Sequence, residues 1–274
     1  MTNRYVRVQT SQKVCYGLLE LNQSVQVLAQ PPWLGETPTG EVLAPDSYKL
    51  LAPCQPSKIV AVGRNYADHA AELGAEVPTE PLLFLKPPSA ILPPDGKILI
   101  PPVSQRVDYE GELALVIGSR AKQITTEDAG QYIWGYTIAN DVTARDLQKT
   151  DAQWTRSKGF DTFCPLGPWI VREISPAALL QTFIYKEGKK DPTKRPAQSA
   201  TIDQMIFSPE VLVAYISQVM TLEAGDVILT GTPAGIGKLE AGDRVVVEIE
   251  GIGKLQNWVA LAHPTSVLNQ NPTL

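Results

Sequence analysis

Histidine and cysteine, the residues that most often build transition-metal sites, are scarce in this chain. Its 274 residues include two histidines, His69 and His263, and three cysteines. Two histidines cannot form a polyhistidine metal site. Cys15, Cys54 and Cys164 form no CxxC pair, so we expect neither a disulfide framework nor a zinc site, but buried thiols in a reducing compartment. Any bound metal must therefore be held mainly by oxygen ligands.

The chain also lacks the charge and hydropathy patterns of nucleic-acid-binding and membrane proteins. Its formal net charge is −5 and its isoelectric point is near 5.2, and no cluster of lysine and arginine is interleaved with aromatic residues. No apolar run approaches the length that spans a bilayer, and the first ten residues lack the apolar core of a signal peptide. We therefore expect a cytoplasmic protein with no nucleic-acid or membrane partner.

The N-terminal region predicts a small β meander followed by a proline-rich segment. Residues 4–28 alternate between apolar and polar side chains, with two polar breaks that are typical of hairpin turns. Residues 30–56 are rich in proline, which is excluded from the interior of a sheet. We predict a boundary near residue 55, with a small β domain at residues 1–55 and a larger domain at residues 56–274.

Two glutamates separated by one residue carry the main chemical signal. They are Glu110 and Glu112 in the run VDYEGELALVIG, residues 107–118, whose β-branched and apolar composition predicts a strand. Alternate residues of a strand share a face, so both carboxylates point the same way, roughly 7 Å apart. The pair is either a solvent-facing acidic edge or a site for a hard cation. Asp141, at the end of a strand predicted over residues 133–142, is either a third ligand or a helix cap.

Other charged residues lie in segments that are typical of binding sites. His69 and Glu72 share one face of a helix predicted over residues 65–73, where they form either a surface pair or part of a site. Lys158 lies in the sequence WTRSKGFDTFCPLGP, residues 154–168, which we predict to be an irregular loop.

Two further charged segments are predicted to lie at the surface. Lys86 is the one charge in the first half of an apolar, proline-split segment, and we expect its ammonium group to reach solvent. Residues 185–195 are polar and basic and predict a hairpin tip, to which we assign no chemistry.

The C-terminal half predicts regular elements on either side of a glycine-rich loop. Residues 208–220 predict a helix with Ser208 as its cap, and residues 226–230 predict a buried strand. That strand leads into GTPAGIG, residues 231–237, which does not fit the phosphate-binding pattern GxxxxGK[ST]. Residues 242–261 predict two more strands.

Seven motifs in this order resemble the fumarylacetoacetate hydrolase family, in its smaller acylpyruvase-like branch. They span residues 57–262 and read VGRNYADHAAELG, LFLKPPSA, DYEGELALVIG, GYTIANDVTARDLQ, RSKGFDTFCPLGP, MIFSPEVLVAYIS and GDVILTGTPAGIG. The resemblance implies an α+β, β-rich fold, a mixed β-roll or sandwich with peripheral helices, and a homodimer. The chain departs from the family pattern between Ile174 and Gln198, where we expect a remodelled surface loop.

The resemblance also implies the roles of individual residues. The ligands of a Mg²⁺ or Mn²⁺ ion are then Glu110, Glu112 and Asp141. The substrate contacts are Lys158, Arg145 and Gln148, with Thr232 at the substrate carboxylate and Arg64 and Tyr66 lining the same pocket. His69 and Glu72 are then a water-activating dyad on a lid.

These residues favour a metal-dependent enzyme that acts on small 2-oxo acids as a C–C bond hydrolase or decarboxylase. Cleavage beyond C3 leaves an enolate, which a divalent ion and Lys158 would stabilise. His69, polarised by Glu72, would deprotonate water for attack on the distal acyl carbon. Acylpyruvate or fumarylpyruvate hydrolysis and oxaloacetate decarboxylation are the first interpretation.

Three alternatives remain open. The same metal site suits an isomerase or decarboxylase of dicarboxylic ring-cleavage products, of the 2-hydroxyhepta-2,4-diene-1,7-dioate isomerase type. It equally suits an oxaloacetate keto-enol tautomerase. A catalytically idle module that binds a dicarboxylate is the alternative from a different class.

Overall fold

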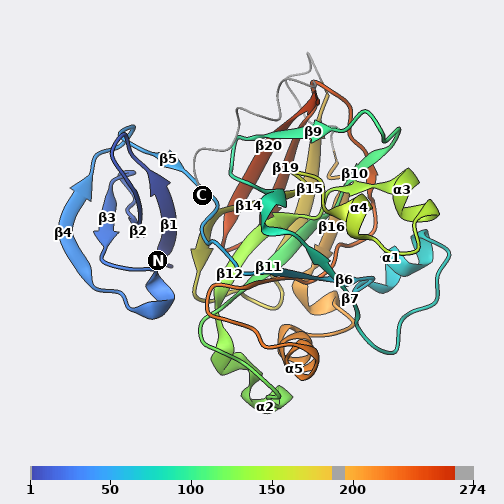
Figure 1. The fold of residues 1–274 in the computed structure, drawn as a ribbon, viewed down its shortest axis with the longest axis horizontal. Helices are drawn as coiled ribbons and strands as arrows, with labels where there is room; N and C mark the ends of the chain where they lie inside the picture. The colour runs from blue at the N-terminus through green and yellow to red at the C-terminus, as the bar shows by residue number, and fades with distance from the viewer. Residues whose placement is uncertain (1, 187–194, 263–274) are drawn as a thin grey trace.

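The computed structural model describes residues 2–186 and 195–262, in which three β-sheets carry the fold (Figure 1). The sheets have twelve, three and five strands, and short helices lie at their margins. This is the α+β, β-rich architecture with peripheral helices that the sequence predicts. His263 and most of the segment predicted as a hairpin tip lie outside the described residues.

The twelve-stranded sheet combines the N-terminal strands with the strands that carry the site. The N-terminal strands are β1 (Arg4–Gln9), β2 (Val14–Leu19), β3 (Val25–Leu28), β4 (Pro38–Leu43) and β5 (Lys49–Leu50). The others are β6 (Ile59–Gly63), β7 (Leu82–Lys86), β8 (Ile91–Leu92), β11 (Gly111–Ile117), β12 (Ile133–Asn140), β14 (Cys164–Val171) and β17 (Val227–Leu229). Their order is β4-β3-β2-β1-β14-β12-β11-β17-β6-β7, with β5 on β1 and β8 on β14.

The N-terminal meander forms as predicted and joins the rest of the molecule through β1. Tyr5 of β1 pairs with Ile170 of β14, and its ring meets Trp134 edge to face with centroids 4.7 Å apart. The proline-containing strand β4 lies at the end of the sheet, as the exclusion of proline from sheet interiors requires. The domain boundary near residue 55 stays a prediction, because the strands on its two sides share one sheet.

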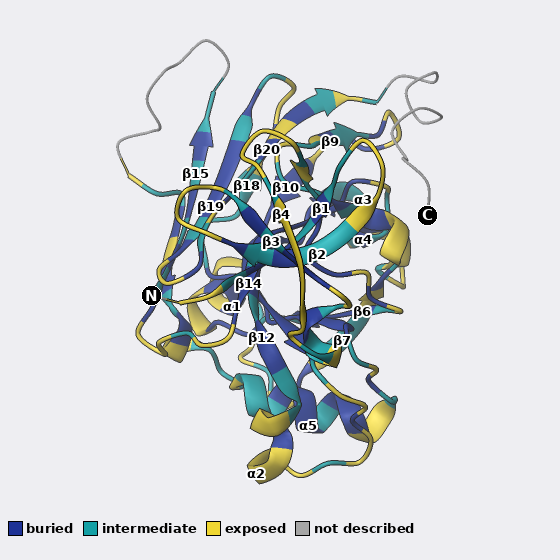
Figure 2. Ribbon diagram, turned by 90° about the vertical axis from the view of Figure 1, so that its left-hand side faces the viewer, coloured by how far each residue is buried: buried dark blue, intermediate teal, exposed yellow. Residues whose placement is uncertain are grey.

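Two smaller sheets complete the fold. The five-stranded sheet consists of β9 (Lys97–Ile100), β15 (Leu179–Tyr185), β16 (Gln198–Thr201), β19 (Arg244–Ile249) and β20 (Gly253–Leu261). The three-stranded sheet consists of β10 (Val107–Tyr109), β13 (Thr143–Ala144) and β18 (Gly237–Lys238). Leu113 and Leu115 of the large sheet share a buried cluster with Val247 and Ile249 of the five-stranded sheet, so the main core lies between these sheets (Figure 2).

The helices are short and peripheral. They are α1 (Ala67–Glu72), α2 (Thr126–Ala129), α3 (Arg145–Thr150), α4 (Thr155–Lys158) and α5 (Pro209–Val219), with 3₁₀ turns at Pro32–Leu34, Pro88–Ala90, Gly130–Tyr132 and Ile202–Gln204. The helix predicted at residues 208–220 is confirmed as α5, and the Ser208 hydroxyl accepts a hydrogen bond from the Val211 N–H. Leu212, Val213 and Ile216 recur at helical spacing and bury its inner face.

The single strand predicted over residues 107–118 is wrong, because the chain changes sheets at Glu110. β10 pairs with β13 and β18, whereas β11 pairs with β12 and β17. At the junction the Glu110 N–H donates to Asn140 Oδ1 at 2.9 Å, and the Asp141 N–H donates to the Glu110 carbonyl at 2.8 Å. These two hydrogen bonds replace the regular strand-to-strand hydrogen bonds that a continuous strand would have made.

The irregular loop predicted over residues 154–168 is confirmed only over residues 159–163, and its two ends are regular. Lys158 ends the one-turn helix α4, and Cys164 begins β14, which continues as a strand past Pro165 and Pro168. The pairing of β14 with β12 shifts register between Gly167 and Val171, and this irregularity accommodates Pro168, which lacks an N–H group. Gly159 therefore marked a short loop, whereas Pro165 and Pro168 marked an irregular strand.

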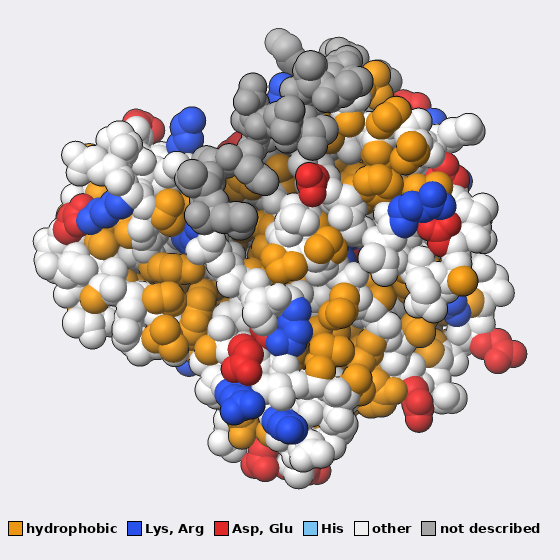
Figure 3. Space-filling model, viewed as in Figure 1, with side chains coloured by type: hydrophobic (Ala, Val, Ile, Leu, Met, Phe, Trp, Pro, Cys, Tyr) orange, Lys and Arg blue, Asp and Glu red, His pale blue; other side chains and the backbone are white. Residues whose placement is uncertain are grey.

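The surface carries no signature of a membrane span or of a large cationic patch on the face drawn in Figure 3. Within the described ranges no helix is long and apolar enough to cross a membrane. On that face lysine and arginine side chains are scattered and mostly lie near acidic ones (Figure 3).

Asp226 ties β6 to the neighbouring strand β17, and both strands lead into the candidate site. Its Oδ1 accepts from the N–H groups of Ser57 and Lys58 at 2.9 and 3.2 Å and from the Ser57 hydroxyl at 2.7 Å. Its Oδ2 accepts from the Glu223 N–H at 2.8 Å and from the Lys58 ammonium. Because Asp226 is fully buried, its removal leaves these donors without an acceptor.

We expect Asp226→Ala to lower the free energy of unfolding by about 3–5 kcal/mol, the usual cost of removing one partner of a buried ion pair. Urea denaturation followed by circular dichroism measures this change. Asp161→Ala, at an exposed aspartate, is the control and should stay within about 0.5 kcal/mol of the wild type. An equally small change in Asp226→Ala would contradict the role assigned to this carboxylate.

Candidate metal and substrate site

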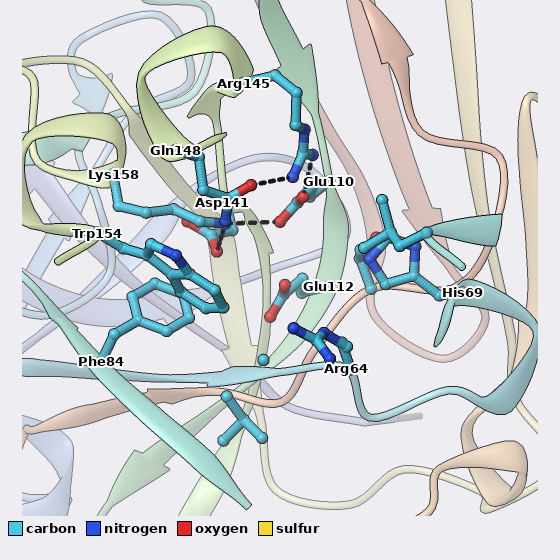
Figure 4. A pocket seen from close by; sticks show the side chains of 14 residues that line it. Arg64, His69, Phe84, Glu110, Glu112, Asp141, Arg145, Gln148, Trp154 and Lys158 are labelled. Carbon is cyan, nitrogen blue, oxygen red and sulfur yellow. Dashed lines mark hydrogen bonds and ion pairs between the residues drawn. The ribbon is translucent and has the colours of Figure 1, made fainter. Parts of the chain in front are cut away.

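A cavity of about 270 Å³ opens where the chain passes between the large and the three-stranded sheet. All site residues predicted from the sequence except Glu72 and Tyr66 line this cavity. Figure 4 shows carboxylates at its centre, with Lys158, Phe84 and Trp154 on one side and His69 and Arg64 on the other. The residues that sequence reasoning missed supply mainly its apolar wall: Val62, Gly63, Leu73, Phe84 and Trp154.

Three buried carboxylates lie together because an antiparallel strand pair brings them into register. Glu112 of β11 pairs with Ala139 of β12, so Asp141, two residues further on, comes to lie opposite Glu110. The ligand oxygens of Glu110, Glu112 and Asp141 all lie within 4.8 Å of one another. The predicted trio thus forms a compact cluster, and Asp141 is not a helix cap.

The electrostatics of Glu112 fit a bound cation. Burial, together with Asp141 and Glu110, raises the pKa of Glu112 well above its ordinary value. Within the described part of the chain its carboxylate has one hydrogen-bond donor, the Gly231 N–H at 2.7 Å, and no cationic partner. A buried carboxylate that faces two others is costly unless a cation compensates it, and oxygen-rich clusters of this kind suit Mg²⁺ or Mn²⁺. The donor set therefore fits a divalent ion.

Lys158 is the principal cation at this cluster. Its Nζ lies 2.8 Å from Glu110 Oε2 and 2.5 Å from Asp141 Oδ2. Burial lowers the pKa of Lys158, but the charges of Asp141 and Glu110 outweigh burial and raise it, so the amine stays protonated at neutral pH. The opposite shift occurs at Glu110. Burial raises the pKa of Glu110, but the charges of Lys158 and Arg145 outweigh burial and lower it.

Lys86 is a second buried lysine at the cluster, and the expectation that it reaches solvent is wrong. Its Nζ donates to Asp141 Oδ1 at 2.6 Å and to the Val142 carbonyl at 3.3 Å. Asp141 is thus held by a lysine on each of its two oxygens, Lys86 and Lys158. The signal that could have identified Lys86 was its position as a lone charge inside an apolar strand.

Arg145 is held in place by a carboxylate that the sequence reasoning did not single out. Its Nε donates to the buried Asp108 Oδ2 at 3.0 Å, its Nη1 to Gln148 Oε1 at 2.5 Å, and its Nη2 to Glu110. Asp108 precedes Glu110 by two residues, so the alternation that identified the two glutamates could also have identified Asp108. Arg145 and Gln148 both line the cavity from helix α3.

His69 and Glu72 form a hydrogen-bonded pair on helix α1. His69 Nδ1 lies 3.0 Å from Glu72 Oε2, and Glu72 Oε1 accepts from the Gly235 N–H at 3.1 Å. The His69 side chain is 5% exposed and that of Glu72 is 32% exposed, so the imidazole faces the cavity and the carboxylate lies behind it. A carboxylate on Nδ1 orients the ring so that Nε2 is available for proton transfer.

Three remaining predicted residues differ in their placement. Arg64 lines the cavity with a left-handed backbone, φ 57°, and its guanidinium makes no hydrogen bond or ion pair with any described residue. Thr232 lines the cavity, but its hydroxyl is bonded to the protein. Tyr66 is buried outside the lining, its hydroxyl has no partner among the described residues, and burial raises its pKa.

An aromatic pair forms the wall beside Lys158. Phe84 and Trp154 meet edge to face with ring centroids 5.3 Å apart, and Lys158 Nζ lies 4.9 Å from the Phe84 centroid. The wall excludes water from one side of the ammonium group, which strengthens its interaction with any negative charge in the cavity.

Two family matches cover most of the chain. Residues 58–260 match the family described as fumarylacetoacetate (FAA) hydrolase C-terminal, and residues 3–53 match the family described as Rv2993c-like, N-terminal.

Named relatives are similar over most of their length. Oxaloacetate tautomerase FAHD2A, mitochondrial, from Bos taurus is 44% identical over 230 residues, which are 80% of this chain and 71% of the relative. The structure of 2-hydroxyhepta-2,4-diene-1,7-dioate isomerase from Mycobacterium marinum is 42% identical with a TM-score of 0.83, over 94% of this chain and 98% of that chain. The structure of fumarylpyruvate hydrolase from Pseudomonas aeruginosa, in complex with Mn²⁺ and pyruvate, is 31% identical with a TM-score of 0.69. The match covers 78% of this chain and 92% of that chain.

The carboxylate cluster predicts that Glu112 is needed for metal binding. Calorimetric titration of Mn²⁺ into Glu112→Ala and into the shape-conserving Glu112→Gln should show affinity weakened by about 10-fold or more, because each variant removes one anionic ligand. Glu127→Ala, at an exposed glutamate of α2, is the control and should bind as the wild type does. Unchanged affinity in both Glu112 variants would remove this residue from the ligand set.

Proposed function

The chain belongs to the fumarylacetoacetate hydrolase family, and we propose that it is a divalent-metal-dependent enzyme that acts on small 2-oxo acids through an enolate. The members of this family named above are enzymes, namely a hydrolase, an isomerase and a tautomerase. The observation that supports the proposal best is that one cavity brings together the carboxylate trio, Lys158 and the imidazole of His69.

The proposed metal ligands are Glu110, Glu112 and Asp141. A Mg²⁺ or Mn²⁺ ion held there would act as a Lewis acid toward the 2-oxo group and carboxylate of the substrate. The Mn²⁺ and pyruvate in the fumarylpyruvate hydrolase neighbour support this assignment.

Cationic and polar side chains around the trio are proposed to bind the substrate. Lys158 keeps its proton and presents it where negative charge develops on the enolate oxygen. Arg145 and Gln148, which are hydrogen-bonded to each other, form the adjoining wall. Arg64 has no anionic partner among the described residues, which supports a role in binding a second carboxylate, as in fumarylpyruvate or oxaloacetate.

His69 is proposed as the base in hydrolysis. Glu72 holds Nδ1, so Nε2 takes a proton from water while the oxygen of that water attacks the distal acyl carbon. The bond between that carbon and C3 breaks, and its electron pair leaves as the enolate of pyruvate. The enolate takes up a proton at C3, so one acylpyruvate and one water give one carboxylic acid and one pyruvate.

Oxaloacetate chemistry is the second candidate. Loss of CO₂ from oxaloacetate gives the same enolate without water, and keto-enol interconversion moves one proton between C3 and the 2-oxygen. The 44% identity with an oxaloacetate tautomerase favours this candidate. The isomerase neighbour likewise supports activity on unsaturated dicarboxylates. The homodimer, the cytoplasmic location and the absence of a nucleic-acid partner stay predictions.

A spectrophotometric substrate panel tests the proposal. Acylpyruvates, fumarylpyruvate and oxaloacetate are offered with Mg²⁺, with Mn²⁺ and after removal of metal by a chelator. We expect turnover of at least one of them that is lost on chelation and restored by the added ion. Turnover of none of them, or turnover that resists chelation, would sink the proposal.

The two reactions should separate in His69→Ala. Hydrolysis needs an activated water, so its rate should fall by about 10²-fold to 10⁴-fold. Decarboxylation needs mainly the stabilisation of the enolate by the metal ion, so it should keep a much larger fraction of its rate. Glu72→Ala should show the same pattern more mildly, because it orients the imidazole. Equal losses in both reactions would mean that His69 holds the substrate or helix α1 and does not activate water.

Lys158→Met should lose about 10²-fold or more in kcat, the usual scale for one electrostatic donor. Because Lys158 lies buried between two carboxylates, its loss should also destabilise the metal-free protein by about 3–5 kcal/mol, and Mn²⁺ should offset part of this loss. Activity is therefore measured below the melting temperature with saturating Mn²⁺, and Lys149→Met on the exposed face of α3 is the control. Near-normal turnover in Lys158→Met would remove Lys158 from the mechanism.

A further inference from the structure

A closed ring of hydrogen bonds links the carboxylate cluster to the glycine-rich loop. Gln198 is buried at the start of β16, and its Oε1 accepts from the Gly111 N–H at 2.9 Å. Its Nε2 donates to Thr232 Oγ1 at 2.7 Å and to the Pro233 carbonyl at 2.8 Å. Thr232 Oγ1 in turn donates to the Gly111 carbonyl at 2.9 Å and closes the ring.

The ring holds a residue that has no side chain of its own to anchor it. Gly111 lies between Glu110 and Glu112, and a Cβ at this position would come within 2.3 Å of Thr182 Oγ1 and 2.9 Å of Val247 Cγ1. Only glycine fits there, and glycine weakens a strand because its backbone is less restricted. Gln198 and Thr232 bind the N–H and C=O of Gly111, so they fix the peptides that direct both glutamates.

The ring also decides what the Thr232 hydroxyl can do. A hydroxyl has one proton, and that of Thr232 is given to the Gly111 carbonyl, while Gln198 occupies one of its lone pairs. The amide of Gln198 cannot be reversed, because Gly111 offers an N–H and Pro233 offers a carbonyl. The hydroxyl therefore has no proton left for a substrate carboxylate. The main-chain N–H of Thr232 has no partner among the described residues and is available instead.

We propose that Gln198 is a positioning residue that holds the peptide between the two metal-binding glutamates and sets the Thr232 loop, so that the substrate carboxylate is bound by the Thr232 N–H and not by its hydroxyl. This inference rests on the proposed function, because it takes Glu110 and Glu112 as metal ligands and Thr232 as a substrate contact. Neither the Gln198 amide nor the Thr232 hydroxyl touches the reacting atoms in this proposal. Its effect is on how the ligands and the loop are held.

Calorimetric titration of Mn²⁺ alone tests the ring without turnover. Gln198→Leu should weaken Mn²⁺ binding by about 10–100-fold, the usual effect of removing a group that orients metal ligands. Thr232→Val keeps the side-chain shape and the main-chain N–H but breaks the same ring, so it should weaken Mn²⁺ binding comparably. The double variant should be no worse than Gln198→Leu, because groups of one network are not additive. Gln181→Leu, on the neighbouring strand β15, is the control and should bind as the wild type does.

Three results would overturn the inference. One is wild-type Mn²⁺ affinity in Gln198→Leu, and another is losses that multiply in the double variant. The third is Thr232→Val with normal Mn²⁺ affinity but a raised KM for fumarylpyruvate, which would make the hydroxyl the substrate's donor. If the wild type itself fails to bind Mn²⁺, the proposed function fails and the inference falls with it; binding by the wild type separates the two failures.

Gln198→Glu keeps the test decisive if Gln198→Leu does not fold, as judged by circular dichroism. It retains an acceptor for the Gly111 N–H and loses the donors to Thr232 and Pro233. Mn²⁺ affinity should then be at least that of the wild type, while the KM for fumarylpyruvate rises by about 10-fold or more. A weakened Mn²⁺ affinity with unchanged KM would contradict the proposal.

Discussion

Repulsion among three buried carboxylates is the constraint on which the rest of this structure depends. Glu110, Glu112 and Asp141 are buried and bring their oxygens within 4.8 Å of one another. The charge of such a cluster must be compensated by cations or by bound protons. Lys158, Lys86 and Arg145 reach it from three different segments of the chain, and they compensate Glu110 and Asp141 but not Glu112. The asymmetry leaves one carboxylate for which an external cation is the natural partner.

The fold supplies these groups from elements that are far apart in sequence. β7 carries Lys86, Glu110 lies between β10 and β11, Asp141 directly follows β12, and α4 carries Lys158. At the change of sheet, two nearby acidic residues share one cation. Asp108 and Glu110 both bind Arg145, and Glu110 also binds Lys158.

What could be predicted from the sequence was local. The closeness of Glu110 to Glu112, the Ser208 cap of α5 and the N-terminal meander each depend on neighbours within a few residues. Lys86 and Gln198 could not be placed, because their burial depends on partners that lie 55 and 87 residues away, Asp141 and Gly111. Glycine and proline misled the prediction around Lys158, since they accompany an irregular strand as well as a loop. The resemblance to a known family pointed to most of the polar residues that line the cavity, but not to the contacts that hold them.

The pairing of β1 with β14 protects the larger part of the molecule against association through an unpaired strand edge. Without the N-terminal meander, the side of β14 that faces Tyr5 would present unpaired N–H and C=O groups, and such edges recruit strands from other molecules. The meander moves the free edge outward to β4, whose first five residues are exposed and include Pro38 and Glu41. Proline and charge both oppose the addition of a further strand. The N-terminal segment therefore replaces an edge that favours pairing with another chain by one that disfavours it.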